Sequence, residues 1–229
     1  MAAHSGPKVE ISNLAVKVDL ANIKSYASGS TTLYDKINNL SMTMARSVSN
    51  GIINSINSAV TLPSTSALNT DTHSIFFMIK FNTTATYGAN GYSGSWDKIL
   101  SFNAGGSDRS PSIWRWPSER TLHWRYDPGN TGCDFGKNSL GTGYQFDIDK
   151  WYHVGATKNG ATATSYVNGV SLGTSTVANP KTAGNAPVII FESYPTDLAS
   201  LASLTIYNTV LSPAQVRQNF QALRGRFGI

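Results

Sequence analysis

The stretch that decides the fold runs from Trp151 to Leu172 and reads Trp-Tyr-His-Val-Gly-Ala-Thr-Lys-Asn-Gly-Ala-Thr-Ala-Thr-Ser-Tyr-Val-Asn-Gly-Val-Ser-Leu. It holds two β-rich segments, Trp151–Thr157 and Ala163–Val167, on either side of a Lys-Asn-Gly turn. Asn168-Gly169 then supplies a tight hairpin turn, because Asn and Gly adopt positive φ most readily, and Val170–Leu172 follows. The stretch therefore predicts three consecutive strands of an antiparallel sheet.

Further segments have the residue types of strands and are separated by Gly, Asn, Pro and Ser turns at the spacing of a β-sandwich. They are Ser74–Phe81, Lys98–Phe102, Ser112–Trp116, Thr121–Tyr126, Ala186–Phe191 and Ala202–Tyr207. Ser74–Phe81 is nearly continuous in apolar character, which indicates a strand buried at the centre of the sandwich. Pro117–Arg120 predicts a hairpin connection. The pattern as a whole predicts an all-β, antiparallel sandwich.

One helix is expected, near the C-terminus. Ser212 is a good N-cap, and Pro213 suits the first helical position because its missing N–H costs nothing there. Apolar residues then recur on one face that should pack on the sheets, at Val216, Phe220 and Leu223. Gly225 is placed to end the helix.

Composition excludes several classes of protein. The chain has 229 residues and a formal net charge of +5, and only 14% of its residues are charged. The excess of positive charge is spread along the chain. It weakly favours binding to polyanionic surfaces but does not indicate a nucleic-acid-binding protein. Cys133 is the single cysteine, so an internal disulfide is excluded. No apolar run is long enough for a membrane-spanning helix, and the N-terminus lacks the apolar centre of a secretory signal. We expect an N-terminal arm over residues 1–12 and a single domain over residues 13–229.

Four parts of the chain carry a resemblance to a known family. They are Leu14–Tyr26 with Gly29–Asp35; Ser74–Phe81; Trp151–Gly160 continuing to Ser165–Val170; and Leu204–Asn208 with Leu211–Val216 and Asn219–Ile229. Together they resemble the concanavalin A-like lectin/glucanase superfamily, in particular laminin-G-like domains, and among these the versions in virion proteins of tailed bacteriophages. The resemblance implies a jelly-roll sandwich with a short C-terminal helix. It also implies a place in the virion, with other virion proteins as partners and a homo-oligomeric assembly.

The sequence departs from the family in two places. Lys36–Met42 replaces the Gly- and Asn-rich turn that often follows the aspartate at position 35. Ala199–Ser203 has no acidic residue where relatives often carry one, which weakens any inherited calcium site. Asp127, Asn130 and Asp134 could still supply hard oxygen ligands for Ca²⁺. An Asp/Asn/Gly loop is more often a simple turn, so we expect no metal or other cofactor, with calcium as the alternative.

Glycosidases share this fold, and retaining ones need two carboxyl groups about 5–5.5 Å apart. Acids two or four residues apart share one face of a strand. Asp147 and Asp149 are the one acidic pair at that spacing, and they precede a strand, where aspartates typically shape a turn. The glutamates, Glu10, Glu119 and Glu192, are far apart, and the family's Glu-x-Asp-x-x-Glu pattern is missing. No local nucleophile motif is present either. The sequence therefore predicts that the protein is not an enzyme.

Aromatic and basic residues gather between Arg109 and Tyr126. Strand alternation places Trp114 and Trp116 on one face of the first strand, opposite Ile113 and Arg115. On the second strand it places Leu122, Trp124 and Tyr126 opposite His123 and Arg125. One interpretation makes a face of this strand pair a binding platform of indoles and Arg side chains. The other places the tryptophans in the core and the arginines in solvent.

We expect Leu122 and Trp124 in the core, and for Arg115 and Arg125 both interpretations stay open. The candidate residues for binding a ligand or partner are Trp114, Arg115, Trp116, His123 and Arg125.

The first functional hypothesis is a non-enzymatic virion structural protein, a capsid decoration or a tail or neck accessory, whose arm over residues 1–12 suits strand addition to a neighbour. The alternative is a carbohydrate-binding module that attaches to host-surface glycans, and a glycan-degrading enzyme ranks third. Neither nucleic acid nor a membrane is expected as a partner.

Overall fold

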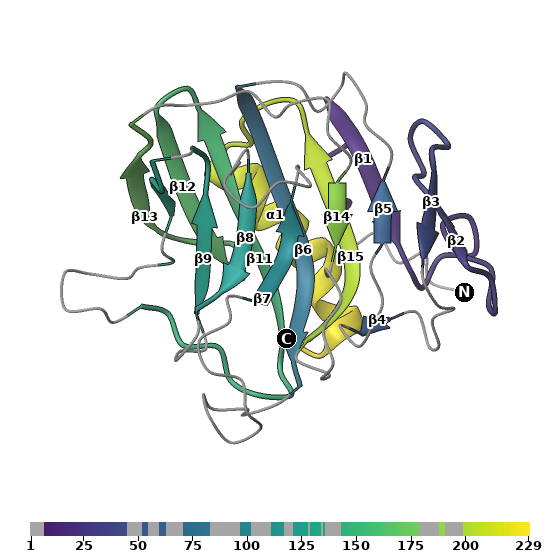
Figure 1. Ribbon diagram of the computed structural model, residues 1–229. Coiled ribbons are helices and arrows are strands. Elements are labelled where there is room, and N and C mark those ends of the chain that lie inside the picture. The colour runs from purple at the N-terminus through teal and green to yellow at the C-terminus, as the bar shows by residue number, and fades with distance from the viewer. Residues whose placement is uncertain are drawn as a thin grey trace.

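In the computed structural model, the described part of the chain forms two stacked antiparallel sheets and one helix (Figure 1). The structure describes residues 7–44, 52–54, 60–62, 71–82, 97–101, 111–116, 121–127, 129–133, 135, 143–178, 188–190 and 199–229. This confirms the expected all-β sandwich with a C-terminal helix.

Sheet A contains the strands that the sequence predicted with most detail. Its order is β1 (Leu14–Asp19), β15 (Ala199–Tyr207), β6 (Thr72–Phe81), β11 (Trp151–Asn159), β12 (Thr162–Val167) and β13 (Val170–Thr176), and β4 (Ile53–Asn54) pairs with β15. The Asn168-Gly169 hairpin joins β12 to β13 as expected, with φ of 49° and 78° at its two residues. β11 is longer than predicted, since Lys158 and Asn159 still pair with β12.

Sheet B lies against sheet A and is built mostly from shorter strands. Its order is β10 (Gly132–Cys133), β9 (Leu122–Arg125), β8 (Ser112–Arg115), β7 (Asp97–Ser101), β14 (Val188–Ile190), β5 (Val60–Leu62), β3 (Ser41–Met44) and β2 (Thr32–Tyr34). The sequence predicted β7, β8, β9 and β14 but not β2, β3, β5 or β10. β8 pairs with β9 as expected, while the predicted connection, residues 117–120, lies outside the described residues.

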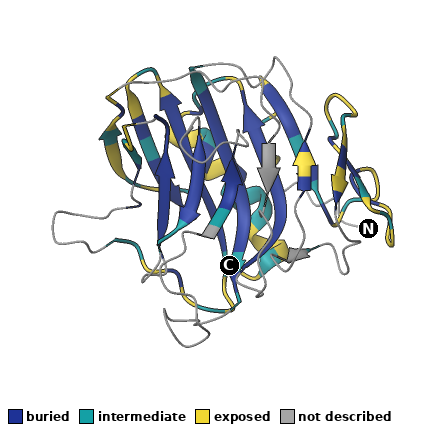
Figure 2. Ribbon diagram, in the orientation of Figure 1, coloured by how far each residue is buried: buried dark blue, intermediate teal, exposed yellow. Residues whose placement is uncertain are grey.

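The core fills the space between the two sheets. Because side chains alternate along a strand, every second residue of each sheet points inward. Phe77 of β6 stacks on Trp124 of β9 with ring centroids 5.8 Å apart, and Trp124 stacks in turn on Phe135 at 5.8 Å. Trp124 and Leu122 are fully buried, which confirms their predicted core positions. Figure 2 shows β6, β11 and β15 of sheet A and β8 and β9 of sheet B as largely buried, with exposed residues on β13 and around β2 and β3.

Helix α1 (Pro213–Phe227) covers the outer face of sheet A. Ser212 is its N-cap, as expected, and completes a capping box with Gln215. Val216 is buried in a small cluster with Phe76 and other outward-facing residues of sheet A, so the predicted apolar face does pack on the sheet. The predicted end at Gly225 is wrong, because the helix continues to Phe227 and is capped by Gly228 in the left-handed conformation (φ 70°).

The segment just before β1 also packs on α1, although the sequence assigned residues 1–12 to an arm; residues 1–6 lie outside the described residues. The backbone N–H of Glu10 donates to Asn219 Oδ1 at 2.7 Å, and Gln215 Nε2 donates to the Glu10 carboxylate at 3.1 Å. Hydrogen bonds from Ser12, above all from its backbone N–H, lower the pKa of Glu10 to about 2. Residues 8–12 thus contact α1 in this structure, and the division into an arm over residues 1–12 and a domain over residues 13–229 stays a prediction.

We expect Asn219→Ala to lower the free energy of unfolding by about 1–3 kcal/mol, because Asn219 is buried and bridges two groups that would lose a partner. Its Oδ1 accepts from Glu10, and its Nδ2 donates to the Tyr207 hydroxyl at 3.0 Å. Urea denaturation measures the change. Gln218→Ala is the control. Gln218 is exposed, and among the described residues its side chain bonds to the Lys8 carbonyl alone, so the variant should lose no more than about 0.5 kcal/mol of stability. Equal losses in the two variants would contradict this account.

No helix among the described residues is both long enough and apolar enough to cross a membrane.

Candidate functional site

The outer face of sheet B carries most of the residues that the sequence singled out. Residues paired across antiparallel strands point to the same face. Trp114 of β8 pairs with His123 of β9, and Ser112 pairs with Arg125. Trp124 faces the core, so the residues on either side of it, His123 and Arg125, face outward. We call Trp114, Trp116, His123 and Arg125 the aromatic–arginine face.

His123 holds the two tryptophans of this face together. Its ring lies 5.8 Å from the ring of Trp114, and Trp116 meets it edge-on at 4.9 Å and 81°. His123 Nε2 is also 3.0 Å from Asn130 Oδ1, which fixes the orientation of the imidazole. Trp114 and His123 are buried, whereas Trp116 is half-buried. Trp116 is therefore the indole of this face that can offer a surface to a ligand.

The two arginines occupy different environments. Arg125 is 5% exposed, and its Nη1 donates to the carbonyls of Trp124 at 3.1 Å and Cys133 at 3.2 Å. The bond to Cys133 joins β9 to β10, so part of the guanidinium has a structural role. Arg115 is half-buried and pairs with Leu122, which places it on the opposite face of β8 from Trp114. The structure thus brings four of the five candidate residues together and separates Arg115 from them.

A row of small polar residues crosses the same face of sheet B, and the sequence did not reveal it. Successive cross-strand pairs join Thr32, Thr43, Thr61, Ile189, Ser101, Ser112, Arg125 and Gly132. Thr43 and Thr61 are exposed, whereas Ser101 and Ser112 are buried. We call the five Thr and Ser residues the hydroxyl row. The sequence feature that could have indicated the outward-facing threonines is the apolar–polar alternation of Ser41–Met44 and Val60–Leu62.

The aspartates considered for hydrolysis form a turn, as the sequence indicated. Asp149 has φ 58°, and its N–H donates to the Phe81 carbonyl at 2.8 Å. Its carboxylate lies 3.4 Å from Lys80 Nζ, while Asp147 accepts from Lys150 Nζ at 2.8 Å. Both carboxylates are thus paired with lysines at the surface.

The other carboxylates whose side chains the structure describes also have partners. Asp19 pairs with Arg226, Asp35 accepts from two backbone N–H groups, Asp71 pairs with the buried Lys158, Asp127 accepts from Thr131, and Glu10 accepts from Ser12 and Gln215. Within this part of the chain, each of these carboxylates is thus engaged by a cation or by hydrogen-bond donors.

The loop considered for calcium is closed by its own hydrogen bonds. Asp127 is buried, and its carboxylate accepts from both the backbone N–H and the hydroxyl of Thr131. Asn130 uses its side-chain oxygen on His123, and Asp134 lies outside the described residues. No group of three or more His, Cys, Asp or Glu side chains gathers as a metal site among the residues described. The side-chain oxygens of Asp127 and Asn130 are therefore already hydrogen-bonded within the protein.

Comparison with protein families gives a match over most of the chain. The family model of the concanavalin A-like lectin/glucanases superfamily matches residues 54–217. Among curated protein sequences, none matches this chain. The finer resemblance to phage virion proteins stays a prediction.

Solved structures with the same fold come from several kinds of protein. The chain is similar to the binding domain of botulinum neurotoxin serotype D (TM-score 0.66, 15% identity, covering 91% of this chain and 51% of that chain). It is similar to Trypanosoma rangeli sialidase (TM-score 0.64, 15% identity, 95% and 34%). It is also similar to domain 4 of AbnA, an extracellular arabinanase of Geobacillus stearothermophilus, solved in complex with arabinotriose (TM-score 0.58, 17% identity, 91% and 98%). The chain spans about a third of the sialidase and about half of the neurotoxin binding domain, and at these identities the likeness shows the fold.

Proposed function

Because the chain belongs to the concanavalin A-like lectin/glucanase superfamily, we propose that it is a non-catalytic binding protein that recognises glycans through the outer face of sheet B. One observation carries this proposal. Trp116 stands partly exposed on a face that also carries the exposed hydroxyl groups of Thr43 and Thr61. An indole stacks on the C–H face of a sugar ring, and hydroxyl groups donate to and accept from sugar hydroxyls.

The pairing of the described carboxylates supports binding without hydrolysis. Each one has a hydrogen-bond or ion-pair partner, and the one acidic pair at strand spacing, Asp147 and Asp149, is held by Lys150 and Lys80. The arabinanase domain adds weight, because this chain covers nearly all of it and it was solved with arabinotriose.

A glycan array followed by titration calorimetry tests the proposal. We expect Trp116→Ala to weaken binding of the retained glycan by about tenfold or more, since stacking on an aromatic ring supplies a large part of such affinity. Trp151→Ala is the matched control, because Trp151 is also half-buried but lies on β11 of sheet A. Equal affinities of Trp116→Ala and wild type would remove this face from the proposal.

A second candidate is the one that the sequence ranked first, a structural protein of a phage particle bound to neighbouring virion proteins. The observation that favours it is the open edge of β13. Within the described strands β13 pairs with β12 alone, and its seven residues, Val170–Thr176, carry no charge. An uncharged, exposed edge accepts an added strand from another chain. Localisation in the virion and a homo-oligomeric state belong to this candidate.

Mass spectrometry of purified phage particles tests this second candidate. A virion structural protein should be present at a fixed stoichiometry relative to the major shell protein. Its absence from intact particles would exclude the role. Light scattering of the purified protein, with Leu172→Pro as a disruption of the β13 edge, tests whether that edge carries an oligomer.

A further inference from the structure

Exposed apolar side chains and cations lie on and around two neighbouring turns beside β1. Three large apolar side chains are exposed there: Ile23 (85%), Ile37 (45%) and Tyr34 (40%). Four cations accompany them: Lys17, Lys24, Lys36 and Arg226. We call these seven residues the isoleucine–lysine patch, and we propose that it docks the protein on the surface of an anionic lipid bilayer. The inference is independent of the glycan face, because the patch shares no residue with it.

The two turns lie side by side. The Tyr34 N–H donates to the Ser25 carbonyl at 2.7 Å, and Tyr26 forms a β-bridge with Leu33. The Lys36 N–H donates to the carbonyl of Lys17 at 2.9 Å, which ties the second turn to β1. The backbones of the two turns are therefore held next to each other.

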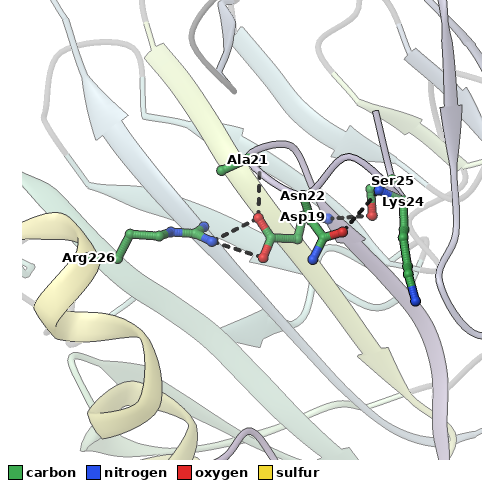
Figure 3. Close-up of polar contacts among 6 residues, drawn as sticks. All are labelled: Asp19, Ala21, Asn22, Lys24, Ser25 and Arg226. Atoms are coloured by element: carbon green, nitrogen blue, oxygen red, sulfur yellow. Dashed lines mark hydrogen bonds and ion pairs between the residues drawn. The ribbon is translucent and has the colours of Figure 1, made fainter. Parts of the chain in front are cut away.

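Local hydrogen bonds fix the first turn, residues 19–26. The Asp19 carboxylate accepts from the Ala21 N–H at 3.2 Å, and Asn22 Oδ1 accepts from the Lys24 N–H at 3.0 Å (Figure 3). The Ser25 hydroxyl accepts from the Asp19 N–H at 3.2 Å. Ile23 sits at the tip of this fixed turn, so its exposure follows from the turn geometry.

The second turn is fixed in the same manner by Asp35. This buried carboxylate accepts from the N–H groups of Lys17 and Asn38, both at 2.6 Å. Asn38 Nδ2 reaches the carbonyl of Ala15 at 2.7 Å. Ile37, between Asp35 and Asn38, points away from these contacts and stays exposed.

Charge favours an anionic partner at this surface. Arg226 reaches both oxygens of Asp19 at 2.8 Å, and Figure 3 shows Lys24 on the other side of the turn. No ion pair engages Lys17, Lys24 or Lys36 within the part of the chain that the structure describes. Burial, and after it the nearby charges of Lys36 and Arg226, lower the pKa of Lys17, which agrees with three cations lying close together. The four cations outnumber the two nearby carboxylates, Asp19 and Asp35, so the net charge of the patch is positive.

The composition of the patch fits a lipid surface better than a protein surface. Lysine is depleted at protein interfaces, whereas each lysine near an anionic membrane contributes to binding. Apolar side chains at the tips of turns can enter the boundary between headgroups and acyl chains. Such docking requires no membrane-spanning segment. The sequence-based expectation of no membrane partner rested on the lack of such a segment, so it does not argue against docking at the membrane surface.

Vesicle co-sedimentation tests the proposal with two lipid compositions, phosphatidylcholine alone and phosphatidylcholine mixed with phosphatidylglycerol. We expect the wild type to bind the mixed vesicles, and to bind less as salt rises because salt screens the charges. Ile23→Ser should weaken binding by about tenfold, since one apolar side chain no longer enters the bilayer. Lys24→Gln and Lys36→Gln should each weaken it by about fivefold.

Matched controls lie elsewhere on the surface. Ile11 is 73% exposed but precedes the other end of β1, and Arg217 is an exposed cation on α1. Ile11→Ser and Arg217→Gln should bind as the wild type does. Absence of binding to the mixed vesicles would overturn the proposal, even if a protein partner were found for the patch. So would equal losses in Ile23→Ser and Ile11→Ser. Circular dichroism checks that each variant is folded.

Discussion

Replacing Trp124 with alanine is expected to lower the free energy of unfolding by about 3–5 kcal/mol, a large part of the stability of a domain of this size. The ring is fully buried and lies between Phe77 of β6 and Phe135, nearly parallel to both, at interplanar angles of 14° and 21°. Its removal leaves a cavity where the two sheets meet, and the strands around it are too well paired to close that cavity. Urea denaturation followed by circular dichroism measures the loss.

Trp116→Ala is the matched control for this prediction. Trp116 is half-buried on the outer face of the same sheet, so its truncation should cost clearly less, about 1–2 kcal/mol. If the Trp124 variant lost less than about 1 kcal/mol, the stacked rings would not be the centre of the core.

Lowering the pH from about 6.5 to about 4 is expected to remove about 3 kcal/mol of stability through His153 alone. Burial lowers the pKa of His153 from its ordinary 6.5 to about 4. Below pH 6.5 the unfolded chain binds a proton at this residue and the folded chain does not. Stability therefore falls as the pH falls through this window and levels off below about 4.

The surroundings of His153 explain why it stays neutral. The ring is 2% exposed and stacks on Phe76 at 5.1 Å and on Phe220 of α1 at 6.3 Å. Its Nδ1 has no hydrogen-bond partner among the groups that the structure describes.

Denaturation curves of wild type and His153→Phe at several pH values check this prediction. The phenylalanine variant should lose the slope between pH 6.5 and 4, because an aromatic ring remains but no titratable group does. The Glu10 carboxyl contributes only at lower pH, since its pKa falls from 4.5 to about 2, so the two effects separate. An unchanged slope in the variant would show that other groups cause the acid sensitivity.

The sequence predicted those parts of the fold that local patterns determine. The long strands β6 and β11 and the Ser212 cap have their signals within a few residues of chain. The strands β2, β3, β5 and β10 have two to four residues each, so their local patterns are too short to identify them as strands.

Long-range contacts also explain the wrong helix end. Beyond Gly225, Phe227 packs on Trp151 at 5.0 Å and Arg226 pairs with Asp19, and both contacts favour another turn of helix. The sequence has two glycines that could end the helix, Gly225 and Gly228, and no local feature shows which of them does.

For the candidate site, the alternation of β8 and β9 predicted which side chains share a face. It did not predict that Trp114, His123 and Arg125 would be buried there, because burial depends on what else covers the face. The hydroxyl row was beyond reach for a similar reason, since it exists only once the register of the whole sheet is known.

Solution NMR of the protein with the glycan retained on the array tests binding without cleavage at this face most directly. We predict shifts of the Trp116 indole N–H and of the Thr43 and Thr61 amides, with anomeric signals of the glycan that stay constant over days. Shifts confined to other surfaces, or new reducing-end signals from a cleaved glycan, would contradict it.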